Sequence, residues 1–171
     1  VNIEPNMKNY DAACRENKLE VPEYFNYTVD IFEKHARERG DKVALMLGGA
    51  DGTTYEKYTF EQLSRMVNQY CHVFHKLGLR KGDRVLVLMG WRYEWHVTML
   101  AMIKLGIIAI PTTTQSRPRD LLYRFDASNS VGIICSPDLM EVVDSMSPQS
   151  KTLRYKMVVG LSGSAKNGWM D

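Results

Sequence analysis

The stretch LVLMGWRYEW (residues 86–95) changes character at a single glycine. Residues 86–89 are apolar without alternation, which is typical of a strand that is covered on both faces. Gly90 then leads into a turn that carries two large indoles, Trp91 and Trp95. The stretch therefore predicts a buried strand whose carboxyl end opens onto an aromatic turn.

Four short apolar runs of this kind follow one another along the chain. They are Val85–Met89, Ile107–Ile110, Val131–Cys135 and Met157–Val159, and they begin 22, 24 and 26 residues apart. Each gap has room for one helix, and we expect helices over Arg92–Leu105 (ended by Gly106), from Pro118 behind a Ser116 cap to Ser128, and from Pro137 behind a Ser136 cap to Met146. The alternation predicts an α/β fold with an open, mainly parallel sheet and helices on both faces.

The part of the chain before this alternation has its own pattern. Residues 1–26 are polar and form a lead-in, whereas 27–171 are expected to form one α/β subdomain. A helix is predicted from Tyr27 to Arg39 with Gly40 as its cap, followed by a hairpin of strands 43–47 and 54–58. The next helix starts behind Thr59, which forms a capping box with Gln62, and runs with one apolar stripe to Leu77.

Composition and charge exclude several classes of protein. The net charge is +2 with no basic block, so we expect no nucleic-acid partner. The longest apolar run, 98–111, is interrupted by Lys104 and is shorter than the ~20 residues of a membrane span. Three widely spaced cysteines suit free thiols in a reducing compartment such as the cytoplasm. His72 and His75 have no nearby Cys or carboxylate, so no metal site is expected.

Polar and aromatic residues gather where the first two parallel strands end. Ligands of open α/β sheets bind outside the carboxyl ends of the strands. Trp91 and Tyr93 follow the first strand, and 112–115 follow the second. Trp91 fits either a ligand site or helix packing, whereas Trp95 fits packing. The stretch GLSGSAKNG (160–168) fits either an ordinary turn or a phosphate cradle of backbone amides.

Three stretches, in order and correctly spaced, resemble a known family. They are YTFEQLSRMVNQYCHVFHKLGLRKGDRVLVLM (58–89), MIKLGIIAIPTTT (102–114) and RPRDLLYRFDASNSVGIICSPD (117–138). Together they resemble the AMP-forming acyl-coenzyme A synthetases of the adenylate-forming ligase superfamily. The Leu-Tyr-Arg motif and the closing GWMD look most similar to the medium-chain synthetases. An acetyl- or aryl-coenzyme A ligase is the alternative within the superfamily.

The resemblance implies a fold context and a reaction. The chain would be the first part of a large N-terminal domain, without the phosphate-binding loop and the C-terminal domain. The reaction joins a carboxylic acid to coenzyme A through an acyl-adenylate, and it uses ATP and Mg²⁺. By position, Thr113, Thr114 and Gln115 are expected on the coenzyme A side, and Trp91 and Tyr93 beside the acyl group.

The same resemblance implies limits on what this chain does alone. No catalytic residue is expected before Asp171, so the isolated chain should be inactive. It should self-associate unless a neighbour covers the sheet edge and face that the missing parts would cover. The compartment implied is the cytoplasm, or the mitochondrial matrix if the source is eukaryotic. A non-catalytic α/β binding module remains the alternative from another class.

Overall fold

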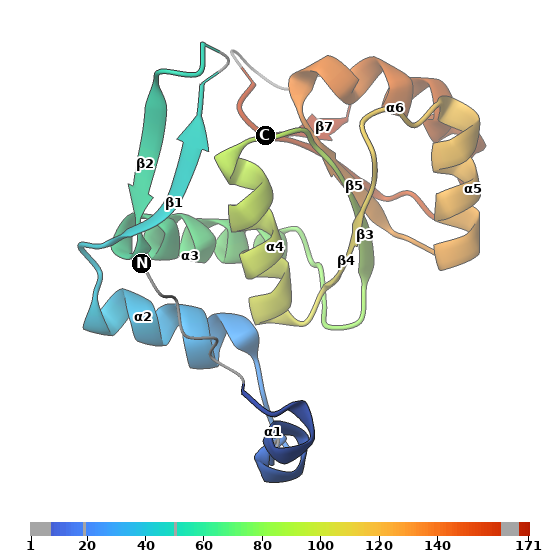
Figure 1. The fold of residues 1–171 in the computed structure, drawn as a ribbon. Coiled ribbons are helices and arrows are strands. Elements are labelled where there is room, and N and C mark those ends of the chain that lie inside the picture. Colours follow the sequence, from blue (N-terminus) through green and yellow to red (C-terminus); the bar gives the residue numbers. More distant parts are fainter. Residues whose placement is uncertain (1–7, 19, 50, 162–167) are drawn as a thin grey trace.

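The computed structural model describes residues 8–18, 20–49, 51–161 and 168–171. The helices (α, with short 3₁₀ or π turns as η) and strands (β), most of which Figure 1 labels, follow one another in this order: α1 (Tyr10–Glu16), η1 (Thr28–Phe32), α2 (Glu33–Glu38), β1 (Val43–Gly48), β2 (Tyr55–Thr59), α3 (Phe60–Lys76), β3 (Arg84–Leu88), α4 (Tyr93–Leu105), β4 (Ile108–Pro111), α5 (Pro118–Ser128), β5 (Gly132–Cys135), η2 (Pro137–Leu139), α6 (Met140–Met146), η3 (Ser147–Gln149), β6 (Tyr155–Val158) and β7 (Trp169–Met170). The four strands expected in the second half of the chain are β3, β4, β5 and β6.

The main sheet has the strand order β4-β3-β5-β6-β7, and all of its pairings are parallel. In order of appearance this is 2-1-3-4-5, so the chain first adds a strand on one side of β3 and then crosses to the other side. The switch between the two directions lies between β3 and β5, and their carboxyl ends form a crevice there. The expected parallel sheet is confirmed.

Helices cover both faces of this sheet, as the apolar runs predicted. One core joins α3 and α4 to the sheet and includes the fully buried Val67, Val85 and Ala101. The other core joins α5 and α6 to the opposite face and includes Leu86, Leu121 and Val143. Figure 1 shows the two helix pairs on either side of the sheet. Alternate side chains of β3 enter different cores, which explains why its sequence is apolar without alternation.

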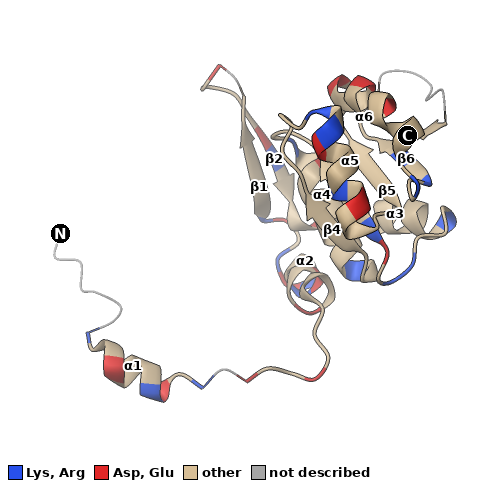
Figure 2. Cartoon of the chain, turned by 90° about the vertical axis from the view of Figure 1, so that its right-hand side faces the viewer, with Lys and Arg blue, Asp and Glu red and all other residues tan. Residues whose placement is uncertain are grey.

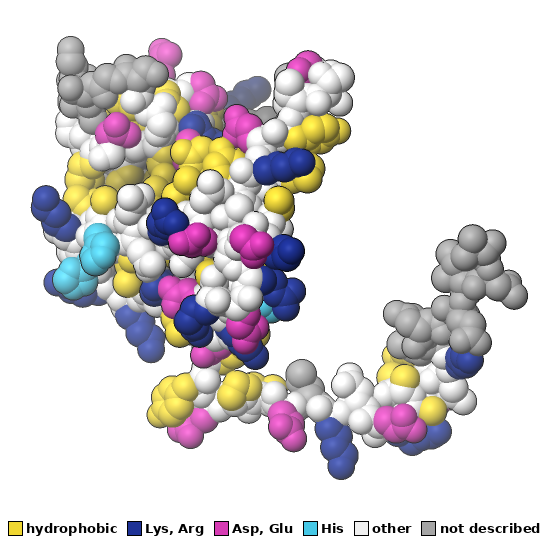
Figure 3. Space-filling view, turned by 90° about the vertical axis from the view of Figure 1, so that its left-hand side faces the viewer, with side chains coloured by type: hydrophobic (Ala, Val, Ile, Leu, Met, Phe, Trp, Pro, Cys, Tyr) yellow, Lys and Arg dark blue, Asp and Glu magenta, His cyan; other side chains and the backbone are white. Residues whose placement is uncertain are grey.

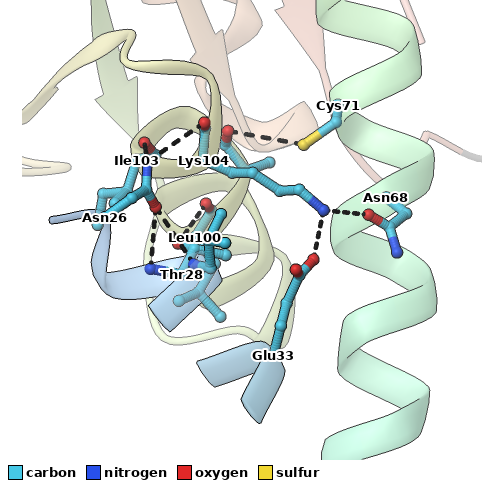
Figure 4. A network of polar contacts seen from close by, with 10 residues as sticks. Asn26, Thr28, Glu33, Asn68, Cys71, Leu100, Ile103 and Lys104 are labelled. Atoms are coloured by element: carbon cyan, nitrogen blue, oxygen red, sulfur yellow. Dashed lines mark hydrogen bonds and ion pairs between the residues drawn. The ribbon is translucent and has the colours of Figure 1, made fainter. Parts of the chain in front are cut away.

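The hairpin and the helix before it pack against α3 and α4. Strands β1 and β2 pair antiparallel, as expected, and the Thr59–Gln62 capping box that begins α3 is present. Figure 4 shows how η1 and α2 are attached by polar contacts. Thr28 donates to the carbonyl of Leu100 over 2.8 Å, and the ammonium group of Lys104 lies between Glu33 and Asn68.

Several local expectations were wrong. Gly40 does not cap the preceding helix, because Arg39 occupies the C-cap position and Gly40 has no positive φ. A glycine is instead needed there for space, since a Cβ at this position would lie 2.7 Å from the carbonyl oxygen of Ala36. The cap of α5 is Arg117 rather than Ser116, and its N–H donates to Asp120. Ser136 does occupy the expected N-cap position, before η2, but its side chain makes no capping bond. These signals depend on one-residue offsets that spacing does not resolve.

Two further features concern the ends of the sheet and the membrane. Strand β7 was not expected; Trp169 and Met170 pair with Lys156 and Met157 of β6. Among the described ranges, none of the helices combines the length and the apolar character that crossing a bilayer requires.

Candidate functional site

A cleft of about 600 Å³ opens at the carboxyl edge of the sheet, at the switch between β3 and β5. Its walls come from the turns after β3, β4 and β5 and from the end of the hairpin: Leu47, Gly48, Gly49, Thr54, Glu56, Gly90, Trp91, Arg92, Tyr93, Glu94, Thr114, Ser136 and Asp138. The cleft therefore lies where the strand order of an open α/β sheet favours ligand binding.

Aromatic side chains form the wall between the hairpin and α4. The rings of Tyr58 and Tyr93 lie 4.7 Å apart between centroids, and this contact joins β2 to the first turn of α4. The hydroxyl of Tyr58 donates to Glu56 over 2.6 Å, and burial followed by this bond raises the pKa of Tyr58. Trp91 is 77% exposed, and its ring meets the ring of His96 edge-on at 6.3 Å between centroids. Trp91 is thus available to a ligand, whereas Tyr93 is held in place.

An ion pair between Arg92 and Glu94 lines the cleft. Arg92 donates to Glu94 through Nη2 over 2.5 Å and through Nε over 2.8 Å, and Glu94 is only 5% exposed. The bond to Glu94 is the main reason why the pKa of Arg92 is raised. Glu94 also lies in the first turn of α4, where the helix dipole stabilises a negative charge. Both charges are therefore stabilised within the protein.

The same pair contacts the turn that follows β6. Gly160 has φ +68°, and a Cβ built there would lie 2.5 Å from Nη2 of Arg92 and 3.1 Å from Oε1 of Glu94. Strand β5 lies between β3 and β6 in the sheet, so the pair reaches across the end of β5. A glycine at this point lets the backbone leaving β6 approach the ion pair closely.

The charge lining the cleft is acidic. Among the described residues that line it, Arg92 is the one cation, and Glu94 already neutralises it. Glu56 and Asp138 add two further carboxylates. Nucleotide phosphates need unpaired positive charge or converging N–H donors, and the charged side chains seen here do not supply the former. The described part of the cleft suits a neutral or aromatic moiety better than a triphosphate.

The sequence-predicted residues take different positions. Trp91, Tyr93 and Thr114 all line the cleft, although they come from two separate turns. Thr113 and Gln115 are exposed beside it and do not line it; the hydroxyl of Thr113 accepts the Gln115 N–H over 3.3 Å. Trp95 packs partly buried against the core of α3 and α4, as expected.

Sequence reasoning missed part of the cleft. The contact of the Arg92–Glu94 pair with Gly160 has no sequence signature, because Gly160 follows β6 and meets the pair only across the end of β5. Glu56 and Asp138 fall at polar positions of the hydrophobic pattern, so the sequence marks them only as ordinary surface residues. Residues 162–167 of the GLSGSAKNG stretch lie outside the described part of the chain. Among the described residues, none of the His, Cys, Asp and Glu side chains forms a group of three or more that could hold a metal ion.

Comparisons with known proteins identify the family. The model of the family described as "AMP-binding enzyme" matches residues 32–169. The chain is 30% identical over 172 residues to rat acyl-coenzyme A synthetase ACSM3, mitochondrial, covering 98% of this chain and 29% of that protein. It is 33% identical to human acyl-coenzyme A synthetase ACSM5, mitochondrial, over 88% of this chain and 27% of that protein.

A solved structure supports the same assignment. The crystal structure of the anthranilate CoA ligase AuaEII in complex with anthranoyl-AMP is similar with a TM-score of 0.76 and 26% identity, over 88% of this chain and 27% of that one. The chain thus spans less than a third of the proteins it matches. The resemblance to acyl-coenzyme A synthetases, and to the medium-chain group among them, is confirmed. The match over 32–169 shows that this chain belongs to the AMP-binding enzyme family.

Proposed function

We propose that the chain is the first part of the N-terminal domain of an ATP-dependent acid–thiol ligase. The whole protein would activate a carboxylic acid, with a medium-chain fatty acid as the first candidate, as an acyl-adenylate and transfer it to coenzyme A. The observation that carries the proposal is the cleft at the switch between β3 and β5 within a chain whose residues 32–169 match the family. In this proposal residues 1–26 remain a lead-in and 27–171 form the first subdomain.

The role of this chain in the reaction is to supply a wall rather than the reacting groups. Trp91 and Tyr93 would contact the apolar or aromatic part of the acid, and Thr114 would lie on the coenzyme A side with Thr113 and Gln115 beside it. Adenylation needs positive charge around the phosphates. The described cleft residues carry no unpaired cation and no metal cluster, so ATP and Mg²⁺ would be held by other parts of the whole protein.

A second candidate is an aryl-coenzyme A ligase. The similar solved structure is named as an anthranilate CoA ligase, and the exposed Trp91 offers a flat surface for an aromatic acid. The names of the rat and human relatives state that they are mitochondrial, which supports the mitochondrial matrix over the cytoplasm if the source is eukaryotic.

Exchange of pyrophosphate into ATP tests this proposal. The 171-residue chain is expected to show no exchange above blank with octanoate, acetate or anthranilate, because the nucleotide site lies elsewhere. The informative comparison is with the protein encoded by the whole gene. If the reading frame continues past Asp171 into a Ser/Thr/Gly-rich loop with a lysine, that longer protein should exchange pyrophosphate into ATP with octanoate. Exchange by the 171-residue chain would refute the proposal that the nucleotide site lies in other parts of the whole protein. A stop codon after Asp171 would favour the non-catalytic binding module.

A further inference from the structure

Trp91 borders two hollows of the molecule. It lines the cleft of about 600 Å³ at the carboxyl edge of the sheet, and it also lines a smaller hollow of about 250 Å³ that it shares with Trp95 and His96. Figures 1 and 2 show α4 between the hairpin and the main sheet, so the turn that leads into α4 forms one side of the cleft. A movement of the Trp91 indole toward the smaller hollow would therefore change the shape of the cleft.

Neither a hydrogen bond nor close packing at Gly90 fixes the Trp91 side chain. Trp91 precedes the first residue of α4, and no atom lies within 4 Å of a Cβ added at Gly90. Among the described residues, the indole N–H of Trp91 has no hydrogen-bond partner. The indole N–H of Trp169, by contrast, donates to Asp144 over 3.0 Å. The Trp91 indole therefore depends on contacts of its ring for a fixed position.

His96 provides such a ring contact. The rings of Trp91 and His96 lie 6.3 Å apart between centroids with 87° between their planes, and the rings of His96 and Trp95 lie 5.1 Å apart with 80° between theirs. Edge-to-face pairs of aromatic rings contribute about 0.5–1.5 kcal/mol beyond the area that they bury. Trp95 in turn packs against the core of α3 and α4. The three rings therefore form a row from that core to the exposed indole, with His96 in the middle.

The two aromatic members of the cleft wall have different ring partners. Tyr93 contacts Tyr58 of the hairpin, and Figure 3 shows hydrophobic side chains gathered across the upper part of this side of the molecule, next to the hairpin. Burial raises the pKa of both tyrosines, so this pair stays uncharged around neutral pH. Trp91 contacts a histidine, the side chain whose charge changes between about pH 5 and 8. The contact of Trp91 is therefore the one that responds to pH.

The surroundings of His96 favour its neutral form. Burial lowers the pKa of His96 from its ordinary value of about 6.5. The smaller hollow adds Arg92, which Glu94 neutralises. His96 also lines an open groove between η1, α2, β1 and α4, where the titratable neighbours are Tyr27 and His35, and where β1 and α3 contribute only apolar side chains. The His96 ring is therefore uncharged at neutral pH and becomes a cation as the pH falls below 6.5.

We propose that His96 is a positioning residue for Trp91, because its ring holds the exposed indole on the wall of the cleft. Without that ring, the indole gains freedom to turn toward the smaller hollow on its other side. The part of Trp91 as a contact of the acid rests on the proposed function. The hold of His96 on Trp91 is a property of this chain and is tested without a substrate, so a failed ligase assay and a failed test of this contact are distinguishable.

Fluorine NMR of the chain labelled with fluorotryptophan tests the contact. The three tryptophans give one resonance each, and Trp91→Phe assigns that of Trp91. In His96→Ser this resonance should narrow and move toward its position in the unfolded chain, whereas His96→Phe, which keeps a ring, should retain most of the parent shift. His72→Ser is the matched control, because His72 is exposed on α3. An unchanged Trp91 resonance in His96→Ser, or a phenylalanine variant that behaves like the serine variant, would overturn the proposal.

A pH titration of the same resonances separates this contact from a general effect on folding. In the parent chain the Trp91 resonance should shift with a midpoint below pH 6.5, because protonation of His96 places a positive charge beside the indole. The shift should disappear in His96→Phe. The Trp169 resonance, which belongs to the other core, should stay in place and shows that the chain remains folded. A Trp91 resonance that does not titrate between about pH 5 and 8, or a titration that persists in His96→Phe, would contradict the role of His96.

Discussion

Replacing Gly160 by alanine should destabilise the fold through two separable effects. The first is backbone strain, because φ is +68° and a side chain in the left-handed region costs about 1–2 kcal/mol. The second is steric: the new Cβ would lie 2.5 Å from Nη2 of Arg92, so the guanidinium has to shift, and we expect the shift to weaken its bond to Glu94. A lost hydrogen bond between charged groups costs about 1.5–3 kcal/mol.

Where the bond is lost, the two terms for Gly160→Ala add up to about 2.5–5 kcal/mol, out of the ~5–15 kcal/mol of a typical domain. Gly52 provides the matched control, because its φ is +69° and no atom lies within 4 Å of an added Cβ. Gly52→Ala should cost only the strain, about 1–2 kcal/mol. In a chain of this size the difference corresponds to several degrees in Tm, since ~1 kcal/mol shifts Tm by about 2–4 °C.

Urea unfolding followed by circular dichroism measures both variants, and a double-mutant cycle isolates the contact. In an Arg92→Ala background the cost of Gly160→Ala should fall to that of Gly52→Ala, because the atom that the Cβ displaces is gone. Equal losses for the two glycine variants, or additive effects in the cycle, would show that the ion pair does not hold the turn after β6.

Two further predictions concern other parts of the chain. At pH 8 a thiol reagent should label the exposed Cys14 quickly and leave Cys135 unlabelled until unfolding, because burial raises the pKa of Cys135 to about 12. The contribution of the Cys135 thiol to stability is complete below the unfolded thiol pKa of about 8.5 and is lost as the pH rises toward 12. Rapid labelling of Cys135 in the native state would contradict its burial. Asp144→Ala should cost about 1–2 kcal/mol in urea unfolding, since Asp144 accepts the buried indole N–H of Trp169 over 3.0 Å and an ammonium hydrogen bond from Lys156 over 2.7 Å; Asp144→Asn keeps an acceptor for the indole and should cost less, so equal losses for the two variants would contradict that role.

Sequence patterns correctly predicted the strands and helices whose formation depends on residues close together in the chain. The run Val85–Met89 is apolar throughout because its alternate side chains enter two cores, and the helix from Phe60 has one apolar stripe because only one side faces the sheet. The same patterns failed for β7. Two residues are too short for periodicity, and Trp169 joins the sheet through contacts with Lys156 and Asp144 that lie far away along the chain.

The candidate cleft divides in the same way. Trp91, Tyr93 and Thr114 could be predicted from their place after apolar strands, because parallel strands end at one edge of a sheet. Glu56 could not, since the position of the hairpin beside that edge depends on the contact between Tyr58 and Tyr93. The inward Asn26 and Thr28 also break the usual rule that apolar side chains point inward, and only their bonds to the carbonyls of α4 explain it.

The sequence by itself determined where the strands and helices other than β7 lie, that the sheet is parallel, and which family the chain resembles. These properties follow from side-chain periodicity and from short blocks that act within about 30 residues. The tertiary structure decided the strand order, the switch between β3 and β5, and the ion pair that bridges to Gly160. Such contacts depend on which face each helix covers and on which turns meet across the sheet, and neighbouring residues in the chain carry no record of either.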